Sequence, residues 1–421
     1  SVLVMWSRLS TAAPRGARSA SSLIVVGTGV AGSAAALKAA EAGVSVTMLN
    51  SSSAATNCNS YWAQGGIISR DPSSSDSASS LSSDIMSAGV HLNSPAAVDQ
   101  LSTLGPSRVS EMLLSSPPSP YACVPFERSG GATGDLLYTL EAAHSHPRIL
   151  YWKDWTGKAI TESLVAACAR HPLIDVRTET VCYDVLVSGS SSRSAAGVRA
   201  LHKPTNTLLD ITSSRGVVLA CGGLSNIYKH STNPRGFNAL GTTASLSVRA
   251  GAAVSDMEYV QFHPTALNLP NSPRYLLTEA LRGEGAVLLD GSGRPFASSY
   301  HPMAELAPRD VVARAVYDAD ANSNGAYLSI AHRPSPWIRS RFPSIDAHLR
   351  SVGLDMTEVG LPVVPAAHYA CGGVDVDLKG RTNVEGLYAA GEGSRTGVHG
   401  GNRLASTSLL EGLVWGAEVG E

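Results

Sequence analysis

The stretch that decides the fold is Leu23-Ile-Val-Val-Gly27-Thr-Gly29-Val-Ala-Gly32. Four apolar residues predict a short buried strand, and the glycines that follow predict a tight turn. The Ala-rich run Ser33 to Ala42 predicts a helix that Gly43 closes, and Val44 to Leu49 predicts a second strand. The fold class expected from this βαβ pattern is α/β with a Rossmann-like domain.

The glycines of this stretch have the spacing G-x-G-x-x-G. Gly27 allows the turn, Gly29 lets a backbone approach a pyrophosphate, and Gly32 lets the helix pack closely on the strand. The helix N-terminus then faces the phosphates. The pattern predicts a dinucleotide site, and its alternative is a tight turn without a ligand. Asn50 stands where an acidic residue would hold the adenosine ribose, and its amide could replace that acid.

Two further glycine turns follow strands and favour FAD over NAD, because a flavin needs backbone contacts along a longer molecule. Gly222 and Gly223 come after the strand expected at Gly216 to Ala220. Glu392 follows a last strand at Gly386 to Ala390, and it would accept a hydrogen bond from a ribityl or ribose hydroxyl. The alternative for Glu392 is a solvated loop carboxylate.

A helix from about Ser408 is expected to end the flavin site. The run Ala405 to Leu410 opens it with hydroxyl residues suited to N-capping. The positive end of the helix dipole would stabilise charge on a reduced flavin.

Composition excludes several classes of function. The 421 residues carry a formal net charge of -2, which gives no field that would gather nucleic acid or an anionic membrane. The 6 cysteines are widely spaced without a C-x-x-C pair, so neither a metal site nor a disulfide framework is expected. No apolar run approaches the roughly 20 residues of a membrane-spanning helix.

The segments outside these motifs are polar. Residues 1–22 contain arginines and hydroxyl residues without an acid, as in an organellar transit peptide for a plastid or a mitochondrion. The alternative is a disordered tail on a cytoplasmic protein. Ser-rich tracts at Ser73 to Ser83, Ser115 to Ser119 and Ser188 to Ser194 predict surface loops.

Further motifs occur in a fixed order along the chain. They are Ala63-Gln-Gly-Gly66, Gln261-Phe-His-Pro-Thr265, Thr278-Glu-Ala-Leu-Arg-Gly-Glu284, Leu306-Ala-Pro-Arg-Asp310, His368-Tyr-Ala-Cys-Gly-Gly373 and His399-Gly-Gly-Asn-Arg403. With the glycine turns they resemble the succinate dehydrogenase/fumarate reductase flavoprotein superfamily, and within it the L-aspartate oxidases. The resemblance implies an FAD-binding domain in two parts, residues 23–255 and 369–421, interrupted by an α+β capping domain at residues 256–368. It also implies that the family's C-terminal helical domain is absent here.

The resemblance assigns the cofactor contacts. FAD would also touch Ser60, Gln64, Gly65, Gly66, Ser408 and Leu409. In succinate dehydrogenases a histidine before A-Q-G-G bonds covalently to the flavin, and Asn59 stands at that place here. Non-covalent FAD is therefore expected.

The resemblance also assigns the substrate contacts. His263, Thr278, Glu279, His368 and Arg403 would bind a dicarboxylate, Arg309 would transfer a proton, and Glu141 would recognise an amine. Taken alone, each histidine could be a buried structural residue, Arg309 could pair with Asp310 or Glu305, and Glu141 could be a solvated acid.

The activity so implied is the oxidation of L-aspartate to iminoaspartate, with oxygen or fumarate as the acceptor. In the family iminoaspartate passes to quinolinate synthase for NAD biosynthesis. A fumarate reductase or succinate oxidase is the first alternative. The second is a degenerate FAD-binding protein without turnover, because Ala142-Ala143 replaces a glycine pair of the family and Gly401 replaces an alanine.

Overall fold

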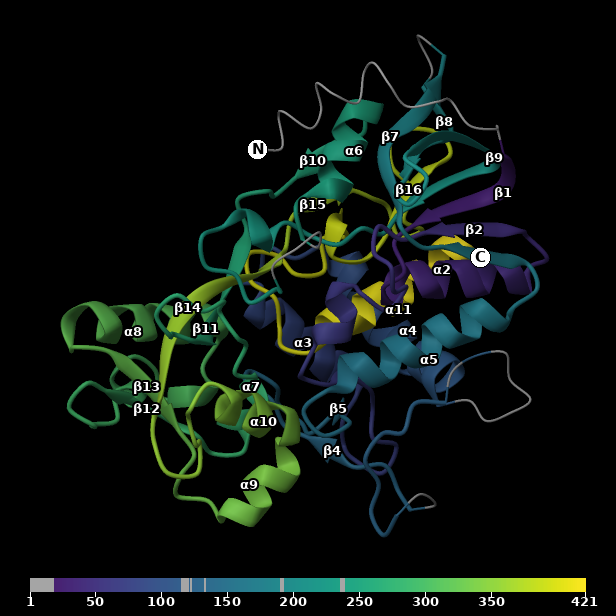
Figure 1. Ribbon diagram of the computed structural model, residues 1–421. Helices are drawn as coiled ribbons and strands as arrows, with labels where there is room; N and C mark the ends of the chain where they lie inside the picture. Colours follow the sequence, from purple (N-terminus) through teal and green to yellow (C-terminus); the bar gives the residue numbers. More distant parts are fainter. Residues whose placement is uncertain (1–18, 115–120, 122, 132–133, 190–192, 235–238) are drawn as a thin grey trace.

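The computed structural model describes residues 19–114, 121, 123–131, 134–189, 193–234 and 239–421. Its main sheet has 7 strands in the order β6-β2-β1-β9-β8-β7, with β16 paired to β9 (Figure 1). The strands are β1 (Ser19–Val26), β2 (Val46–Leu49), β6 (Ile174–Arg177), β7 (Thr180–Ser188), β8 (Ser194–His202), β9 (Thr207–Leu219) and β16 (Leu387–Ala389). All pairs among β6, β2, β1, β9 and β16 are parallel, so their carboxyl ends lie at one edge of the sheet.

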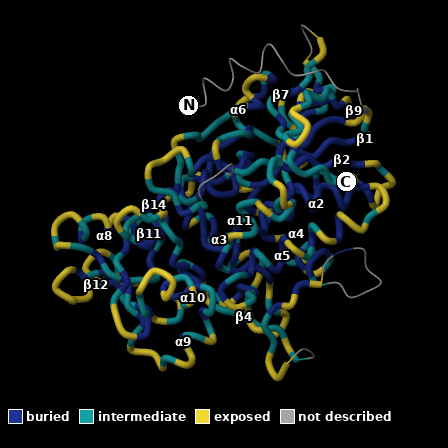
Figure 2. The backbone as a smooth tube through the Cα atoms, in the orientation of Figure 1, coloured by how far each residue is buried: buried dark blue, intermediate teal, exposed yellow. Residues whose placement is uncertain are grey.

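Both faces of this sheet are buried, which is why β1 reads as a continuous apolar run. Leu23 and Val25 pack into the core beneath the helices, whereas Ile24 and Val26 face the opposite core. The helices are α2 (Val30–Glu41), α3 (Ala78–Ala88), α4 (Pro95–Leu113), α5 (Thr156–Arg170), α6 (Thr242–Ala250) and α11 (Thr407–Gly420). Figure 2 shows the buried backbone running through β1, β2 and α2. The βαβ unit expected from the opening motif is confirmed.

Helices α2 and α11 pack closely enough to require glycine. A Cβ atom on Gly416 would lie 2.4 Å from the carbonyl oxygen of Ala31, and one on Gly420 would lie 2.6 Å from that of Ala35. Gly416 lies beside the start of α2 and Gly420 one turn further along it, so the two helices run in the same direction, with α11 starting before α2. Their N-termini, with free N–H groups and positive dipole ends, therefore point the same way.

A second, separate sheet interrupts the chain between the parts that build the first. Its order is β11-β14-β13-β12, with strands β11 (Val260–Leu267), β12 (Val287–Asp290), β13 (Ala326–Ser329) and β14 (Leu361–Ala370). It carries α7 (Glu279–Gly283), α8 (Arg309–Asn322), α9 (Ser335–Arg341) and α10 (Pro343–Ser351) around an apolar core of its own. The exact boundaries at residues 255 and 368 remain a prediction.

Two small sheets complete the described structure. One has the order β3-β5-β4, with β3 (Ile67–Ile68), β4 (Tyr138–Thr139) and β5 (Ile149–Leu150). The other has the order β10-β15-β17, with β10 (Val254–Ser255), β15 (Gly373–Asp375) and β17 (Ser394–Arg395). Single 3-10 turns are η1 (Asn59–Trp62), η2 (Ser225–Ile227), η3 (Ala297–Ser299), η4 (Ala304–Leu306) and η5 (Gly391–Gly393). No helix within the described ranges is long and apolar enough to cross a membrane.

Two expectations for the polar segments are wrong. Ser73 to Ser83 is not simply a loop, because Ser77 caps helix α3 in a reciprocal capping box with Ser80. Leu81, Ile85 and Ala88 form the buried face of that helix, a helical spacing hidden among serines. The predicted N-terminal segment is also too long, since residues 19–22 already belong to β1, where three of them pair with β9. Residues 1–18 and the tract 115–119 lie outside the described part of the chain.

Candidate functional site

A cavity of about 820 Å³ lies between the two sheets. Its lining comes from the turn after β1, the ends of β2 and β9, the turn after β16, the start of α11, and from β11, β14, α7 and α8. The volume lies in the upper part of the range of roughly 300–1,000 Å³ that cofactor and ligand sites occupy. The cavity therefore has room for a long ligand, or for a cofactor with a small second molecule.

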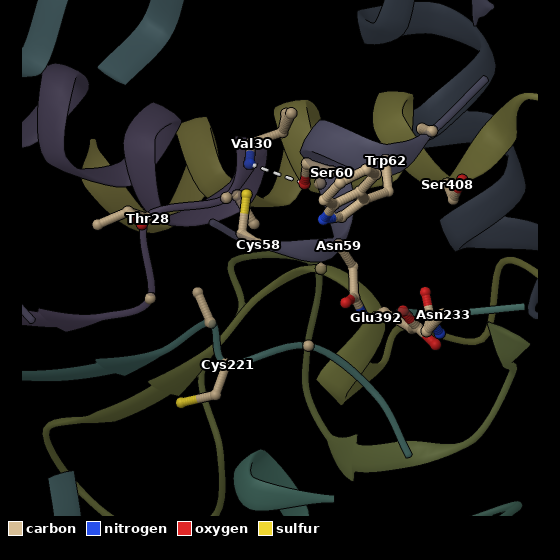
Figure 3. Close-up of a pocket in the computed structure, with 18 of the residues that line it drawn as sticks. Thr28, Val30, Cys58, Asn59, Ser60, Trp62, Cys221, Asn233, Glu392 and Ser408 are labelled. Atoms are coloured by element: carbon tan, nitrogen blue, oxygen red, sulfur yellow. Dashed lines mark hydrogen bonds between the residues drawn. The ribbon is translucent and has the colours of Figure 1, made fainter. Parts of the chain in front are cut away.

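Each glycine of the G-x-G-x-x-G motif is needed for a different structural reason. Gly27 has φ 116°, and a Cβ there would lie 2.1 Å from the carbonyl oxygen of Ala220. A Cβ on Gly32 would lie 2.1 Å from the oxygen of Gly27, so Gly32 serves helix packing. Gly29 faces the cavity, where a Cβ would come within 3.0 Å of Ser60 Oγ. Ser60 accepts a hydrogen bond from the Val30 N–H at 3.2 Å, at the start of α2 (Figure 3).

Asn50 and Glu392 both line the cavity. The Asn50 amide donates to Thr28 Oγ1 at 2.5 Å, and its oxygen accepts from the Ser52 N–H at 2.6 Å, so its amide is already held by the protein. Glu392 accepts from the Ala370 N–H at 3.2 Å. Burial raises the pKa of Glu392 to about 7. A Cβ on Gly223 would lie 2.2 Å from Glu392 Oε1, so this glycine makes room for the carboxylate.

The structure brings most of the predicted site residues together. Those that line the cavity are Gly27, Gly29, Asn50, Ser60, Gln64, Gly65, Gly66, Glu141, Gly222, His263, Thr278, Glu279, Arg309, His368, Glu392, Arg403, Ser408 and Leu409. Gly32 and Gly223 are not among the lining residues; they stand behind the wall and shape it through packing.

Several polar atoms around the cavity lack partners in the protein, and this fits a long polar ligand such as FAD. Both amide atoms of Asn59 are buried without a close hydrogen-bond partner, and the side chain lies beside the Glu392 carboxylate (Figure 3). Gln64 Oε1 is likewise buried and unpartnered. Helix α11 begins without a side-chain cap, so its first N–H groups are not held by a capping side chain. Buried polar atoms normally have partners, and a ligand with hydroxyl, phosphate and ring oxygens would supply them.

Two imidazoles that line the cavity face each other. His263 on β11 and His368 on β14 have ring centroids 5.1 Å apart. The Thr265 N–H donates to His263 Nδ1 at 3.2 Å, so in the neutral ring Nε2 carries the hydrogen. His368 Nδ1 bonds to Thr232 Oγ1 at 2.6 Å. Burial and the neighbouring Arg309 hold the pKa of both rings well below 6.5. Neutral His263 is thus a hydrogen-bond donor.

Two guanidiniums also line the cavity. Arg309, the first residue of α8, donates from Nε to Glu279 and from Nη1 to Gln261 Oε1 at 3.0 Å. Its ion-pair partner is therefore Glu279, and the pairing with Asp310 or Glu305 weighed from the sequence is not formed. Arg403 lies 4.7 Å from the ring centroid of Tyr369, and its Nε is buried without a partner. Burial lowers the pKa of Arg403 to about 10, which leaves it a cation at neutral pH.

Glu141 also lines the cavity, as a buried carboxyl and not as a solvated acid. Ser406 Oγ donates to its Oε2 at 2.6 Å. Burial, and then the nearby charge of Glu279, raise the pKa of Glu141. Ser406 occupies the N-cap position of α11 with φ 55° but makes no capping bond. The expectation that hydroxyl residues cap this helix is therefore wrong for Ser406, whose hydroxyl holds Glu141 instead.

Sequence reasoning missed several residues of the site. Gln261 lies in the motif Gln261 to Thr265, but the sequence did not indicate that it bonds to Arg309. Thr232 lies 136 residues before His368, and no local pattern links them. Ser406 was assigned to capping. Tyr369 donates to buried Glu411 at 2.6 Å, which orients the ring beneath Arg403. Among the residues that the structure describes, no group of three His, Cys, Asp or Glu side chains could hold a metal ion.

A parallel sheet with a glycine turn after β1, a capping sheet and a large cavity between them are together typical of nucleotide-dependent oxidoreductases of the flavoprotein class. The chain belongs to the FAD binding domain family, whose model matches residues 22–409, and within it to the group that contains the L-aspartate oxidases and the succinate dehydrogenase and fumarate reductase flavoproteins.

Individual relatives are similar over much of the chain. L-aspartate oxidase of Yersinia pestis is 42% identical over 305 residues, which is 70% of this chain and 56% of that protein. A chloroplastic L-aspartate oxidase of Nicotiana tabacum is 42% identical over 322 residues, 74% of this chain and 48% of that protein. The chain thus spans about half the length of these curated relatives.

Solved structures share the fold. A quinol fumarate reductase of E. coli has a TM-score of 0.88 at 28% identity, covering 96% of this chain and 70% of that one. The Sdh1 complex of Mycobacterium smegmatis has a TM-score of 0.78 at 30% identity, covering 96% and 68%.

Proposed function

We propose that this chain binds FAD non-covalently and oxidises L-aspartate to iminoaspartate. The observation that carries the proposal is that one cavity is lined by a buried carboxyl, Glu141, together with two imidazoles and two guanidiniums. L-aspartate has two carboxylates and an ammonium, so it needs donors and cations at two points and an anion at a third. The similarity to L-aspartate oxidases supports the same substrate.

Each side chain has a defined task in this proposal. His263 and His368 donate to the oxygens of one carboxylate, and Arg403 holds a carboxylate with its guanidinium. Glu141 accepts from the substrate ammonium. Arg309 transfers the proton that accompanies oxidation, and Glu279 with Thr278 fixes the wall around it. FAD, when bound, accepts the hydride from the substrate.

Asn59 supports non-covalent binding, because an amide cannot form the bond that a histidine makes to a flavin. Oxygen or fumarate would reoxidise the cofactor. Iminoaspartate is unstable in water, so a consumer such as quinolinate synthase is the proposed partner. The chloroplastic relative, together with the arginine-rich start of the chain, supports a plastid location.

A fumarate reductase or succinate oxidase is the second candidate. Its support is the TM-score of 0.88 to the E. coli quinol fumarate reductase, which shows how closely the backbone follows that enzyme. The two candidates differ at Glu141, because succinate and fumarate offer no ammonium to a buried carboxyl.

The test is a substrate panel with the FAD-loaded protein. L-aspartate, succinate, and fumarate with a reduced viologen as the electron donor, are offered in turn. Ammonia released by hydrolysis of iminoaspartate is measured together with consumption of oxygen or fumarate. Ammonia production that depends on L-aspartate supports the proposal. Turnover of succinate or fumarate without L-aspartate activity favours the second candidate, and absence of all turnover favours a protein that only binds FAD.

A further inference from the structure

The turn that carries Glu141 holds the start of helix α11 at two adjacent points. Glu141 accepts from Ser406 Oγ at 2.6 Å, and the ring of His144 bonds through Nε2 to the carbonyl oxygen of Ala405 at 3.0 Å. The His144 N–H bonds to the Glu141 carbonyl at 3.3 Å and closes the turn. All of these side chains are buried. The turn and the helix start therefore form one clamped unit.

The partners of His144 define its protonation state. A carbonyl oxygen can only accept, so Nε2 must carry the hydrogen. Nδ1 lies 3.5 Å from Arg148 Nη1, and a guanidinium can only donate, so Nδ1 is unprotonated. Burial agrees, since it lowers the pKa of His144 to about 4. The ring is thus a neutral donor with a fixed tautomer.

Arg148 anchors this ring to helix α3. It is fully buried and donates to both oxygens of Asp76, at 2.9 and 2.7 Å, and from Nη1 to Asp84 Oδ2 at 2.6 Å. Such bidentate, charge-assisted bonds have a narrow geometry. The clamp is therefore connected to the protein body through two carboxylates.

The clamp also holds two residues in an unfavourable conformation. Ala143 has φ 60° and Ser406 has φ 55°, in the left-handed region that is strained for residues other than glycine. Such residues persist when their surroundings over-determine them. Here the bonds of Glu141 and His144 on either side of Ala143 supply that constraint.

We propose that His144 is a positioning residue that fixes Ser406 through Ala405, and thereby aims Glu141 at the amine of the substrate. The inference rests on the proposed oxidation of L-aspartate and adds a determinant of its specificity. His144 does not line the cavity, so it acts on the substrate only through Glu141. In the proposed function the carboxylates are bound by His263, His368 and Arg403, whose side chains make no hydrogen bond to Glu141, His144 or Ser406.

The experiment compares His144→Phe with His144→Gln. Phenylalanine fills the space without a donor, whereas glutamine can still donate an N–H to Ala405. His144→Phe should lower kcat/KM for L-aspartate about tenfold, leave the value for succinate within about twofold, and His144→Gln should restore most of the loss. His202→Phe is the matched control, because His202 is partly exposed and bonds only locally to Thr205. Equal losses for both substrates would overturn the proposal, since a merely structural role affects both alike.

A second measurement does not depend on turnover. Nitrogen-15 NMR of histidine-labelled protein without FAD should show more than one buried ring in the neutral Nε2–H form, and one of these signals, unchanged from pH 5 to pH 8, should be absent in His144→Phe. If the signal lost in His144→Phe is instead that of a ring charged at pH 7, the proposal is overturned. If the wild-type chain oxidises neither substrate, the proposed function fails. The clamp is then tested by the dissociation constants of L-aspartate and succinate, from their perturbation of flavin absorbance. If His144→Phe binds L-aspartate more weakly and succinate as well as before, the clamp is supported. If both dissociation constants stay unchanged, or rise equally, the clamp is contradicted.

Discussion

Arg309 donates from Nη1 to the side-chain oxygen of Gln261 at 3.0 Å, inside the wall of the cavity. The other side of the same amide donates to the backbone carbonyl of Arg403 at 2.7 Å. Gln261 is buried, and its two ends are therefore both used. One amide thus links the guanidinium of Arg309 to the backbone of Arg403.

Gln261→Met should break this link. The substitution keeps the volume but leaves Arg309 Nη1 and the Arg403 carbonyl unpaired, which costs roughly 1–3 kcal/mol for each buried group. We expect kcat to fall about ten- to hundredfold while FAD stays bound, as measured by turnover and the flavin spectrum. Gln100→Met is the control, because Gln100 makes one bond to Leu378 on the surface. An unchanged kcat would show that the bridge is not needed.

Glu141→Gln should change the choice of substrate. An amide cannot compensate the ammonium charge, so kcat/KM for L-aspartate should fall at least about tenfold. Activity with succinate should persist or rise, because succinate brings no ammonium to this wall. Steady-state kinetics with both substrates test this. An equal fall in kcat/KM for succinate would mean that Glu141 is needed for the fold and does not recognise the amine.

Gly29 and Gly27 offer a matched pair. Gly29→Ala has an ordinary φ and meets only Ser60 Oγ at 3.0 Å, so the chain should fold but bind FAD at least about tenfold more weakly. Gly27→Ala forces a Cβ to within 2.1 Å of backbone at φ 116° and should prevent folding. Circular dichroism and FAD titration separate the two effects. If Gly29→Ala bound FAD with full affinity, the part of the cavity beside Gly29 would not be where the pyrophosphate of FAD binds.

Much of the fold was predictable because local patterns and geometry agree. The run from Leu23 to Gly32 contains its own strand, turn and helix start, and the structure confirms each. Helix α3 was not predictable by inspection, since serines occupy its polar face and conceal Leu81 and Ile85. The site followed from motifs, whereas the Thr232–His368 and Ser406–Glu141 bonds join segments 136 and 265 residues apart. Only the folded chain brings such partners together.

Ala143→Gly should stabilise the protein. Glycine relieves the left-handed strain at φ 60°, and this gain exceeds the extra entropy that it gives the unfolded chain. We expect a rise of about 0.5–1 kcal/mol in the free energy of unfolding, measured by chemical denaturation. Ala142→Gly, next to it without positive φ, should lower stability. A stability loss in Ala143→Gly would contradict the strain described at this turn.

The neutral state of His144 predicts a pH dependence of stability. Its folded pKa of about 4 lies below the ordinary 6.5, so between these values the unfolded chain binds a proton that the folded chain does not. Its contribution is therefore present above pH 6.5 and is lost as pH falls, by about 2 kcal/mol at pH 5. His144→Gln lacks this loss, so its stability deficit should shrink by about that amount between pH 7 and pH 5. A constant deficit in denaturation curves would argue against a neutral ring.

We propose that one cavity holds FAD and L-aspartate side by side, with Arg309 transferring the proton in the reaction between them. The most direct measurement is anaerobic mixing of the FAD-loaded protein with L-aspartate while flavin absorbance is followed. The wild type should bleach, and Arg309→Leu should stay yellow while still binding FAD and L-aspartate. A wild-type flavin that stays oxidised with L-aspartate, or an Arg309→Leu flavin that bleaches as fast as the wild type, would contradict the account.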